Sequence, residues 1–220
     1  MSEILSKESI STRDLIVEQA NEIVNQIGMM DFRIDTLAKA LKISPGNITY
    51  HFARKDDILS AIWFRFNKEV VTNIDSYITP FFDVKQLFLL FRYLLNTIYS
   101  YRGVVSCILG DSGIAKRDEE FNKSMWLALN HKYTSLETLL VDGGYMVAID
   151  DKMIDKLCFE SQVSSIAWWV NHALSSNEGE ILSLVDYYSM IAILPLRPFL
   201  TDKGNEQLIE VMSLVSNDTK

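Results

Sequence analysis

Side chains suited to nucleic-acid contact gather on one face of a short segment near the N-terminus. The segment begins with Ser44-Pro45, an N-cap residue followed by proline at the first helical position, where the missing N–H costs nothing. Ile48 and Phe52 are four residues apart, so both point to one side of a helix. Around the other side lie residues that packing explains poorly: Gly46, Asn47, Thr49 and Tyr50. This outward face predicts a recognition helix that enters a DNA major groove.

Two of these side chains have chemistry that reads bases. The amide of Asn47 suits the edge of adenine, and Tyr50 suits a thymine methyl group or a phosphate. Both are also compatible with phosphate contacts alone, which carry no sequence information. His51, which follows directly, is expected either to border the DNA backbone or to pack beneath the helix.

Positive charge surrounds this segment although the whole chain has a net charge of −8. Residues 1–68 contain nine Lys or Arg and nine Asp or Glu, whereas residues 69–220 contain twelve Lys or Arg and twenty Asp or Glu. Charges act mainly within a Debye length of about 8 Å, so the local balance matters more than the total. Arg33, Arg54 and Lys55 are therefore predicted to face phosphate, with an ordinary solvated surface as the alternative.

Three further helices are expected to position the segment. A helix over residues 12–27 ends at Gly28 in the C′ position, and another covers residues 34–41 with an apolar stripe at helical spacing. A fourth helix begins near Lys55, where the two aspartates that follow suit a positive N-terminal end.

The order of these elements resembles that of the TetR-like (tetracycline-repressor-like) transcriptional regulators over residues 12–70. The residues that carry the resemblance are Gly28, Phe32, Leu37-Ala38, Ser44-Pro45-Gly46-Asn47-Ile48-Thr49-Tyr50-His51-Phe52 and Lys55-Asp56-Asp57-Ile58-Leu59. Three positions depart from the family pattern. Thr49 stands where the family usually has a phosphate-binding tyrosine, Arg33 where it has a Ser/Thr cap, and Arg54 where it has a small polar residue.

The resemblance implies an all-α protein that regulates transcription as a homodimer on a palindromic double-stranded DNA operator. It implies a three-helix, helix-turn-helix DNA-binding domain over residues 1–70 and a larger helical bundle over 71–220 for ligand binding and dimerisation. Most members are repressors released by a small-molecule effector. The positions assigned to DNA contact are Arg33, Ser44, Pro45, Gly46, Asn47, Thr49, Tyr50, His51, Arg54 and Lys55.

The remaining two-thirds of the chain is predicted to be helical as well. Helices are expected over residues 83–101, 117–141, 150–174, 177–197 and 203–215, with a short helix between Gly103 and the turn at 110–113. The apolar run 87–91 indicates that the first of these is central. Asp150 with Ile149 and Ile154, and Asn177 with Glu180, are interpreted as helix starts. By the resemblance, the helices at 150–174 and 177–197 pair across a two-fold axis.

A largely apolar effector pocket is predicted in this second part, with plain core packing as the alternative. Arg92 interrupts an apolar helix, so it must pair with a carboxylate, reach solvent or meet an acidic ligand, and a salt bridge is favoured. Two alternatives remain open for Trp168 and Trp169: one ring lies at a subunit interface and the other inside the bundle, or both rings lie in the core. The candidate pocket residues are Phe88, Phe91, Arg92, Tyr99, Met125, Trp126, Leu129, Tyr133, Trp168 and Trp169.

Several classes of protein are disfavoured. The histidines are isolated, so neither a metal site nor a cofactor is expected. Gly110-Asp111-Ser112-Gly113 resembles a serine-protease nucleophile segment, but no strand pattern accompanies it and an inter-helix turn is the better interpretation. An enzyme is therefore not expected. A helical protein-interaction module without direct DNA reading is the remaining alternative.

The location of the protein follows from its cysteines and its apolar runs. Cys107 and Cys158 have no paired spacing, which is typical of a reducing compartment, and both are interpreted as inert core thiols. No signal-like segment is recognised at the N-terminus, and no apolar run approaches the ~20 residues that span a bilayer. We expect a cytoplasmic protein with no membrane contact.

Overall fold

The computed structural model describes residues 11–109, 119–175 and 178–218, and its regular elements there are helices. The all-α prediction is confirmed. The helices are α1 (Thr12–Asp31), α2 (Ile34–Leu41), α3 (Pro45–His51), α4 (Lys55–Tyr77), α5 (Val84–Ser100), α6 (Arg102–Leu109), α8 (Glu119–Asp142), α9 (Lys152–Ser175), α10 (Glu178–Ile193), the 3₁₀ helix η1 (Leu194–Phe199) and α11 (Asp202–Asp218). None of the described helices is both long enough and apolar enough to cross a membrane.

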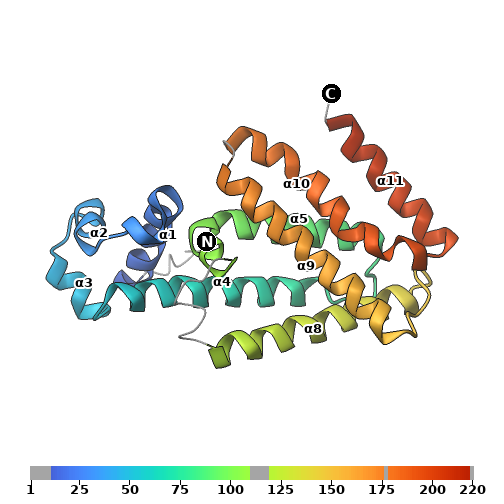
Figure 1. The fold of residues 1–220 in the computed structure, drawn as a ribbon, viewed down its shortest axis with the longest axis horizontal. Helices are drawn as coiled ribbons and strands as arrows, with labels where there is room; N and C mark the ends of the chain where they lie inside the picture. The colour runs from blue at the N-terminus through green and yellow to red at the C-terminus, as the bar shows by residue number, and fades with distance from the viewer. Residues whose placement is uncertain (1–10, 110–118, 176–177, 219–220) are drawn as a thin grey trace, which may run out of the picture.

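One long helix connects the two ends of the molecule. Figure 1 shows α1, α2 and α3 gathered at one end, with α4 running away from them along the rest of the chain. Helix α4 contacts α1 at that end and α5, α6 and α8 further along. Because α4 is continuous over Lys55–Tyr77, the boundary expected near residue 70 falls inside a helix.

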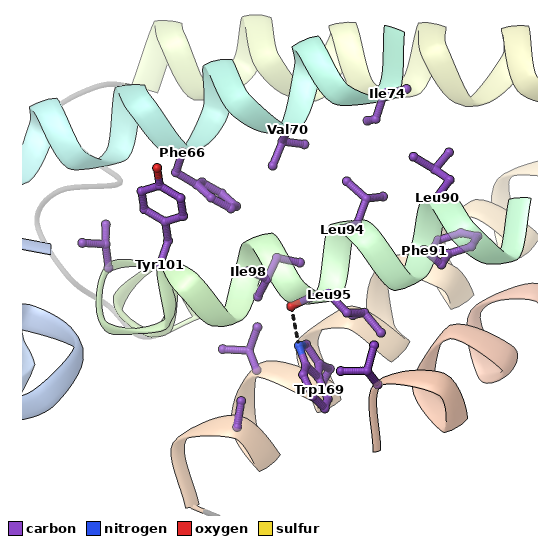
Figure 2. Close-up of a cluster of buried hydrophobic side chains, with 14 of the residues drawn as sticks. Phe66, Val70, Ile74, Leu90, Phe91, Leu94, Leu95, Ile98, Tyr101 and Trp169 are labelled. Atoms are coloured by element: carbon purple, nitrogen blue, oxygen red, sulfur yellow. Dashed lines mark hydrogen bonds between the residues drawn. The ribbon is translucent and has the colours of Figure 1, made fainter. Parts of the chain in front are cut away.

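Helix α5 lies at the centre of the larger part, as its apolar run predicts. It contacts α4, α9, α10 and α11, and it buries side chains on several sides. Figure 2 shows Phe66, Val70 and Ile74 of α4 facing the side chains of α5, with Trp169 on the opposite side of that helix. The indole Nε1 of the fully buried Trp169 donates a hydrogen bond of 3.0 Å to the carbonyl oxygen of Leu95.

The start of α6 docks tightly onto α1. A Cβ at Gly103 would lie 2.4 Å from the carbonyl oxygen of Val24, so only glycine permits this approach. The side chain of Asn25 accepts a hydrogen bond of 2.8 Å from the Gly103 N–H and donates one of 2.8 Å to the Ser100 carbonyl. Asn21 donates a second bond of 2.8 Å to the same carbonyl. This contact, which we call the α1–α6 joint, connects the three-helix end to the body.

Two predicted helix ends differ from the structure, and a third is confirmed. Gly28 has φ 78° and ψ 162°, which are not helical, so the helix that begins at Thr12 is interrupted there as predicted, and a further turn runs to Asp31. Asp151, not Asp150, caps α9, because its Oδ1 accepts from the N–H groups of Met153 and Ile154. The helix expected to reach residue 197 instead becomes η1, which contains Pro195 and Pro198, two residues without an N–H for α-helical bonds. The turn at 110–113 and Asn177 lie outside the described residues.

Candidate nucleic-acid interface and ligand cavity

The turn between α2 and α3 is held by backbone hydrogen bonds. The N–H of Lys42 donates to Lys39 (3.2 Å) and that of Ile43 donates to Ala38 (3.1 Å), the pair of bonds that defines a Schellman motif. Lys42 therefore occupies the left-handed region, with φ 56° and ψ 38°. Glycine would take this conformation with less strain, so the fold itself does not favour lysine here.

Helix α3 is fixed from its inner side and its first turn. The Oγ of Ser44 accepts from the N–H of Asn47 at 3.2 Å, and Pro45 occupies the first turn, as the sequence predicts. Ile48 is fully buried and Phe52 is 2% exposed, so both anchor the inner side of the helix in the hydrophobic core. The opposite face is thereby presented outward by a rigid scaffold.

The outward face consists of the residues singled out from the sequence. Tyr50 is 86% exposed, and Gly46, Asn47 and Thr49 are exposed as well. The hydroxyl of Thr49 donates to the carbonyl of Gly46 at 3.1 Å. His51 is half-buried, and its ring meets the edge of the Tyr50 ring at 5.2 Å between centroids, so both expectations for His51 stay open.

Two cations converge at the end of α1. The guanidinium of Arg33 donates to the carbonyls of Met30 (2.7 Å) and Phe32 (3.2 Å), and the Nζ of Lys55 donates to Met30 (3.3 Å). Burial, followed by the neighbouring charge of Arg33, lowers the pKa of Lys55. The carboxylates of Asp56 and Asp31 partly oppose this effect. An anion bound between the two cations would reduce their mutual repulsion.

Arg54 takes part in the start of α4. Asp57 accepts from the backbone N–H of Arg54 at 3.0 Å, which forms half of a capping box, and the Arg54 Nη2 lies 3.5 Å from Asp57 Oδ1. The Arg54 side chain is 68% exposed, which leaves its guanidinium accessible beside α3.

One neighbouring cation was missed by the sequence analysis. The exposed guanidinium of Arg13, in the first turn of α1, lies 4.2 Å from the centroid of the Phe52 ring at the end of α3. No local spacing signals this contact, because the two residues are brought together only by the packing of α1 on α3.

The body contains a cavity of about 110 Å³ between α4, α5, α8, α9 and η1. Its wall is mostly apolar, with a few polar groups on α8 and α9. The lining residues are Ile74, Leu87, Leu90, Phe91, Leu94, Leu129, Lys132, Tyr133, Leu136, Glu137, Leu140, Phe159, Gln162, Val163, Ile166 and Leu196.

The predicted pocket residues separate into two groups. Phe91, Leu129 and Tyr133 line the cavity. Phe88 is buried in the core without lining it, and Tyr99 lies at the end of α5, where Arg102 covers its ring at 4.3 Å. Met125 and Trp126 belong to α8, but their side chains lie outside the described residues, as does that of Cys107.

Arg92 and the tryptophan pair also lie away from the cavity. The Nε of Arg92 pairs with Asp186 Oδ1 of α10 at 2.6 Å, which is the salt bridge that the sequence favoured. Trp169 is fully buried while Trp168 is 67% exposed, so the interpretation of both as core residues is wrong. Trp168 borders a shallow hollow on α9 that is also lined by Ser164, Ala167 and Asn171.

The polar wall of the cavity contains groups that the sequence analysis did not identify. The hydroxyl of Tyr133 donates to Glu137 Oε1 at 2.9 Å, and Asp155 of α9 lies next to this carboxylate. Burial raises the pKa of Glu137 to about 7, opposed by the Tyr133 hydrogen bond and supported by Asp155. The i, i+4 spacing of Tyr133 and Glu137 on one helix indicates that the two side chains can meet. No sequence pattern indicates that Asp155, on another helix, approaches them.

Cys158 lies close to this wall and is buried. Its Sγ lies 3.5 Å from the Pro195 carbonyl, and burial, with the nearby carboxylates, raises the pKa of the thiol. It therefore remains protonated and unreactive at neutral pH. Within the described parts of the chain, no three His, Cys, Asp or Glu side chains are placed together to hold a metal ion.

Comparison by sequence identifies no relative: no family model matches the chain, and no curated protein matches it. Comparison by structure does. A TetR-family transcriptional regulator from Marinobacter aquaeolei VT8 aligns with a TM-score of 0.76 and 20% identity, over 94% of this chain and 98% of that one. The TetR-family regulator PfmR from Thermus thermophilus aligns with a TM-score of 0.60 and 19% identity, over 83% and 97%.

A third solved structure has a known ligand. SmeT, the repressor of the Stenotrophomonas maltophilia multidrug efflux pump SmeDEF, aligns with a TM-score of 0.63 and 14% identity, over 87% of this chain and 92% of that one. A complex of SmeT with triclosan aligns equally well, over 86% and 92%. The resemblance inferred from the sequence is thus confirmed at the level of the fold.

Proposed function

We propose that this chain, which has the fold of the TetR-family transcriptional regulators, binds a DNA operator in a sequence-specific way and is released from it by a small molecule. The observation that carries the proposal is the outward face of α3. Tyr50 is 86% exposed above a fully buried Ile48, and Gly46, Asn47 and Thr49 are exposed on the same short helix. We divide the chain near residue 70 into a DNA-binding part and a regulatory part.

A homodimer is part of the proposal, since one α3 helix reads only one half-site. We place the dimer interface on α9 and α10, where the exposed Trp168 and Tyr187 would be covered by a second copy. Two recognition helices then occupy successive major grooves, which requires them to lie about 34–36 Å apart or a multiple of that distance. The protein would act in the cytoplasm, as a regulator without catalytic activity.

The cavity beside α4 is the proposed effector site. Its wall includes Ile74 of α4, the helix whose first turn carries Lys55 at the DNA end. A ligand that favours a different position of α4 would change the spacing of the two recognition helices, and it acts only through its different affinity for the two states. The SmeT–triclosan complex shows that a protein of this fold binds a small molecule.

Selection of duplexes from a random pool by the purified protein tests the DNA-binding proposal. We expect a palindromic consensus whose half-sites are one helical turn apart, or a multiple of it. The double variant Tyr50→Ala/Lys55→Ala should melt within a few degrees of the wild type and lose retention of that duplex at least about a hundredfold.

The matched control changes an exposed aromatic residue and an exposed lysine far from α3. Phe81→Ala/Lys85→Ala removes a side chain that is 87% exposed and one exposed cation, and should bind the duplex as the wild type does. If the Tyr50/Lys55 variant also retains full affinity, the α3 face does not read DNA. The protein-interaction module would then be the better explanation.

A further inference from the structure

The cavity contains a buried hydrogen-bond donor that has no acceptor. Gln162 of α9 is 4% exposed and lines the cavity, and its Nε2 has no hydrogen-bond partner in the described structure. A buried amide without a partner destabilises the folded state, so it requires a partner from outside the chain. A ligand that fits this cavity should therefore carry an oxygen that accepts a hydrogen bond from Gln162.

A pair of carboxylates lies at the same wall without a balancing cation. Glu137 of α8 lines the cavity, and Asp155 of α9, which is not among the lining residues, lies within hydrogen-bonding reach of the Glu137 carboxyl group. The other groups facing the pair are the hydroxyl of Tyr133, which donates to Glu137, and the thiol of Cys158. None of these supplies positive charge.

The lysine of the cavity does not compensate the pair. Lys132 lines the cavity, but its Nζ forms an ion pair with Asp75 of α4. The lining residues contributed by α5 and η1 are apolar. The charge of the cavity is thus acidic, and two carboxylates next to an apolar wall favour a cation over a neutral molecule and exclude an anion.

Aromatic rings provide the remaining contacts. Tyr133 and Phe159 are adjacent, with centroids 5.0 Å apart and planes inclined by 54°, and Phe91 lines the cavity from α5. Aromatic faces attract organic cations and also bury their apolar parts. The wall therefore combines negative charge, aromatic surface and one amide donor.

We infer that this cavity binds a small organic cation that also carries a hydrogen-bond-accepting oxygen, with Glu137 as its counter-charge and Gln162 as its donor. This identifies the chemical class of the effector. Only the consequence of binding, release from the operator, rests on the proposed function. Binding itself depends on the cavity alone, so direct titration distinguishes the two.

The test uses two probes of the same shape. Acetylcholine carries a quaternary ammonium and an ester, and 3,3-dimethylbutyl acetate replaces the charged nitrogen by carbon. Calorimetric titration of the full chain should show at least tenfold tighter binding of acetylcholine at pH 8. Because a quaternary ammonium does not titrate, its affinity should rise between pH 6 and pH 8 as Glu137 loses its proton.

Two variants assign the two contacts. Glu137→Gln keeps the shape and removes the charge, so it should abolish the preference for acetylcholine and its dependence on pH. Gln162→Leu should weaken both probes by a similar factor of about fivefold, because both carry the ester. Glu206→Gln, an exposed glutamate of α11, is the matched control and should leave all affinities unchanged.

Each outcome decides a separate point. Equal binding of the two probes, or binding of neither by the folded wild-type protein, overturns the inference. Tight binding of acetylcholine without release of a selected operator duplex would support the site and contradict the proposed regulation. Retained preference in the folded Glu137→Gln variant would show that Glu137 is not the counter-charge.

Discussion

Two glycines near the end of the molecule formed by α1, α2 and α3 occur for different reasons. At Gly103, in the α1–α6 joint, an added Cβ would lie 2.4 Å from the Val24 carbonyl oxygen, so the fold requires glycine. At Gly46, in α3, the nearest atom to an added Cβ is the Ser44 Oγ at 3.8 Å, and φ lies outside the left-handed range. Alanine would fit there and would favour the helix, so the fold does not require glycine.

Like Gly46, Lys42 and Glu137 are residues that the fold does not require. Lys42 occupies a left-handed conformation that glycine adopts more easily, and Glu137 is a carboxyl group whose burial raises its pKa. All three residues stabilise the chain less than an available replacement would. Departures of this kind are expected where a protein contacts something outside itself. The comparison predicts opposite effects of substitution in the two groups.

The largest loss of stability is expected from Gly103→Ala. The new methyl group would force α6 away from α1, and overpacking of this kind costs about 3 kcal/mol. Urea denaturation, followed by circular dichroism, measures the change. A variant as stable as the wild type would show that the α1–α6 joint is not closely packed.

Glu137→Gln is expected to stabilise the protein by an amount that grows from about pH 4.5 upward and is complete just above pH 7. The pKa of Glu137 is raised from 4.5 to about 7, so the folded state holds this proton more tightly than the unfolded state does. Its contribution to stability is present below pH 4.5 and is lost as the pH rises through 7. Allowing for partial exposure, we expect a gain of about 2 kcal/mol at pH 8 and none at pH 4.

Urea titrations of this variant and the wild type at several pH values provide the measurement. Glu206→Gln again serves as the control, because it is exposed and should show no pH-dependent difference. An equal gain at pH 4 and pH 8 would contradict a raised pKa for Glu137.

Asn25→Ala removes both side-chain hydrogen bonds that hold the start of α6. We expect a loss of about 1.5 kcal/mol, because the N–H of Gly103 would be left without its acceptor. Asn21→Ala removes one bond to a carbonyl that keeps its bond from Asn25, so it should cost about 0.5 kcal/mol. Thermal melts of the two variants side by side test the difference, and the reverse order would disprove this assignment.

Lys42→Gly should stabilise the free protein by about 0.5–1 kcal/mol, because glycine relieves the left-handed backbone. The same change removes a cation next to α3. If Lys42 meets a phosphate, the slope of log affinity against log salt should fall by about 1. Lys85→Ala, which removes an exposed cation on α5, should leave the slope unchanged.

The smallest change in stability is expected from Gly46→Ala. Alanine should raise the free energy of unfolding by about 0.5 kcal/mol, since it favours a helix and meets no neighbour. We also expect it to weaken operator binding by about tenfold, because the new methyl group would hold the helix away from the groove. An unchanged affinity would mean that DNA does not approach this position.

The end formed by α1, α2 and α3 could be derived from the sequence in some detail, because its signals are local. The cap at Ser44, the proline after it and the spacing of Ile48 and Phe52 specify which face of α3 points outward without any distant contact. The interruption at Gly28, with φ 78°, was also predicted from the glycine itself, whereas the further turn to Asp31 was not.

The cavity could not be derived in the same way. Tyr133 and Leu129 were identified from helical spacing, but Phe88 and Tyr99 satisfied the same pattern and lie elsewhere. Aromatic residues at helical spacing mark a buried face, and they do not indicate which of the buried positions borders an empty volume.

The sequence by itself determined where the helices lie, that they form an all-α fold, and which residues α3 displays. Helical periodicity and capping act over three or four residues, so they can be recognised without a structure. Only the tertiary structure decided that Gly103 meets the Val24 carbonyl, that Trp169 reaches Leu95 and that Gln162 shares a cavity with Glu137. Those contacts join residues on different helices, and they depend on how the whole bundle packs.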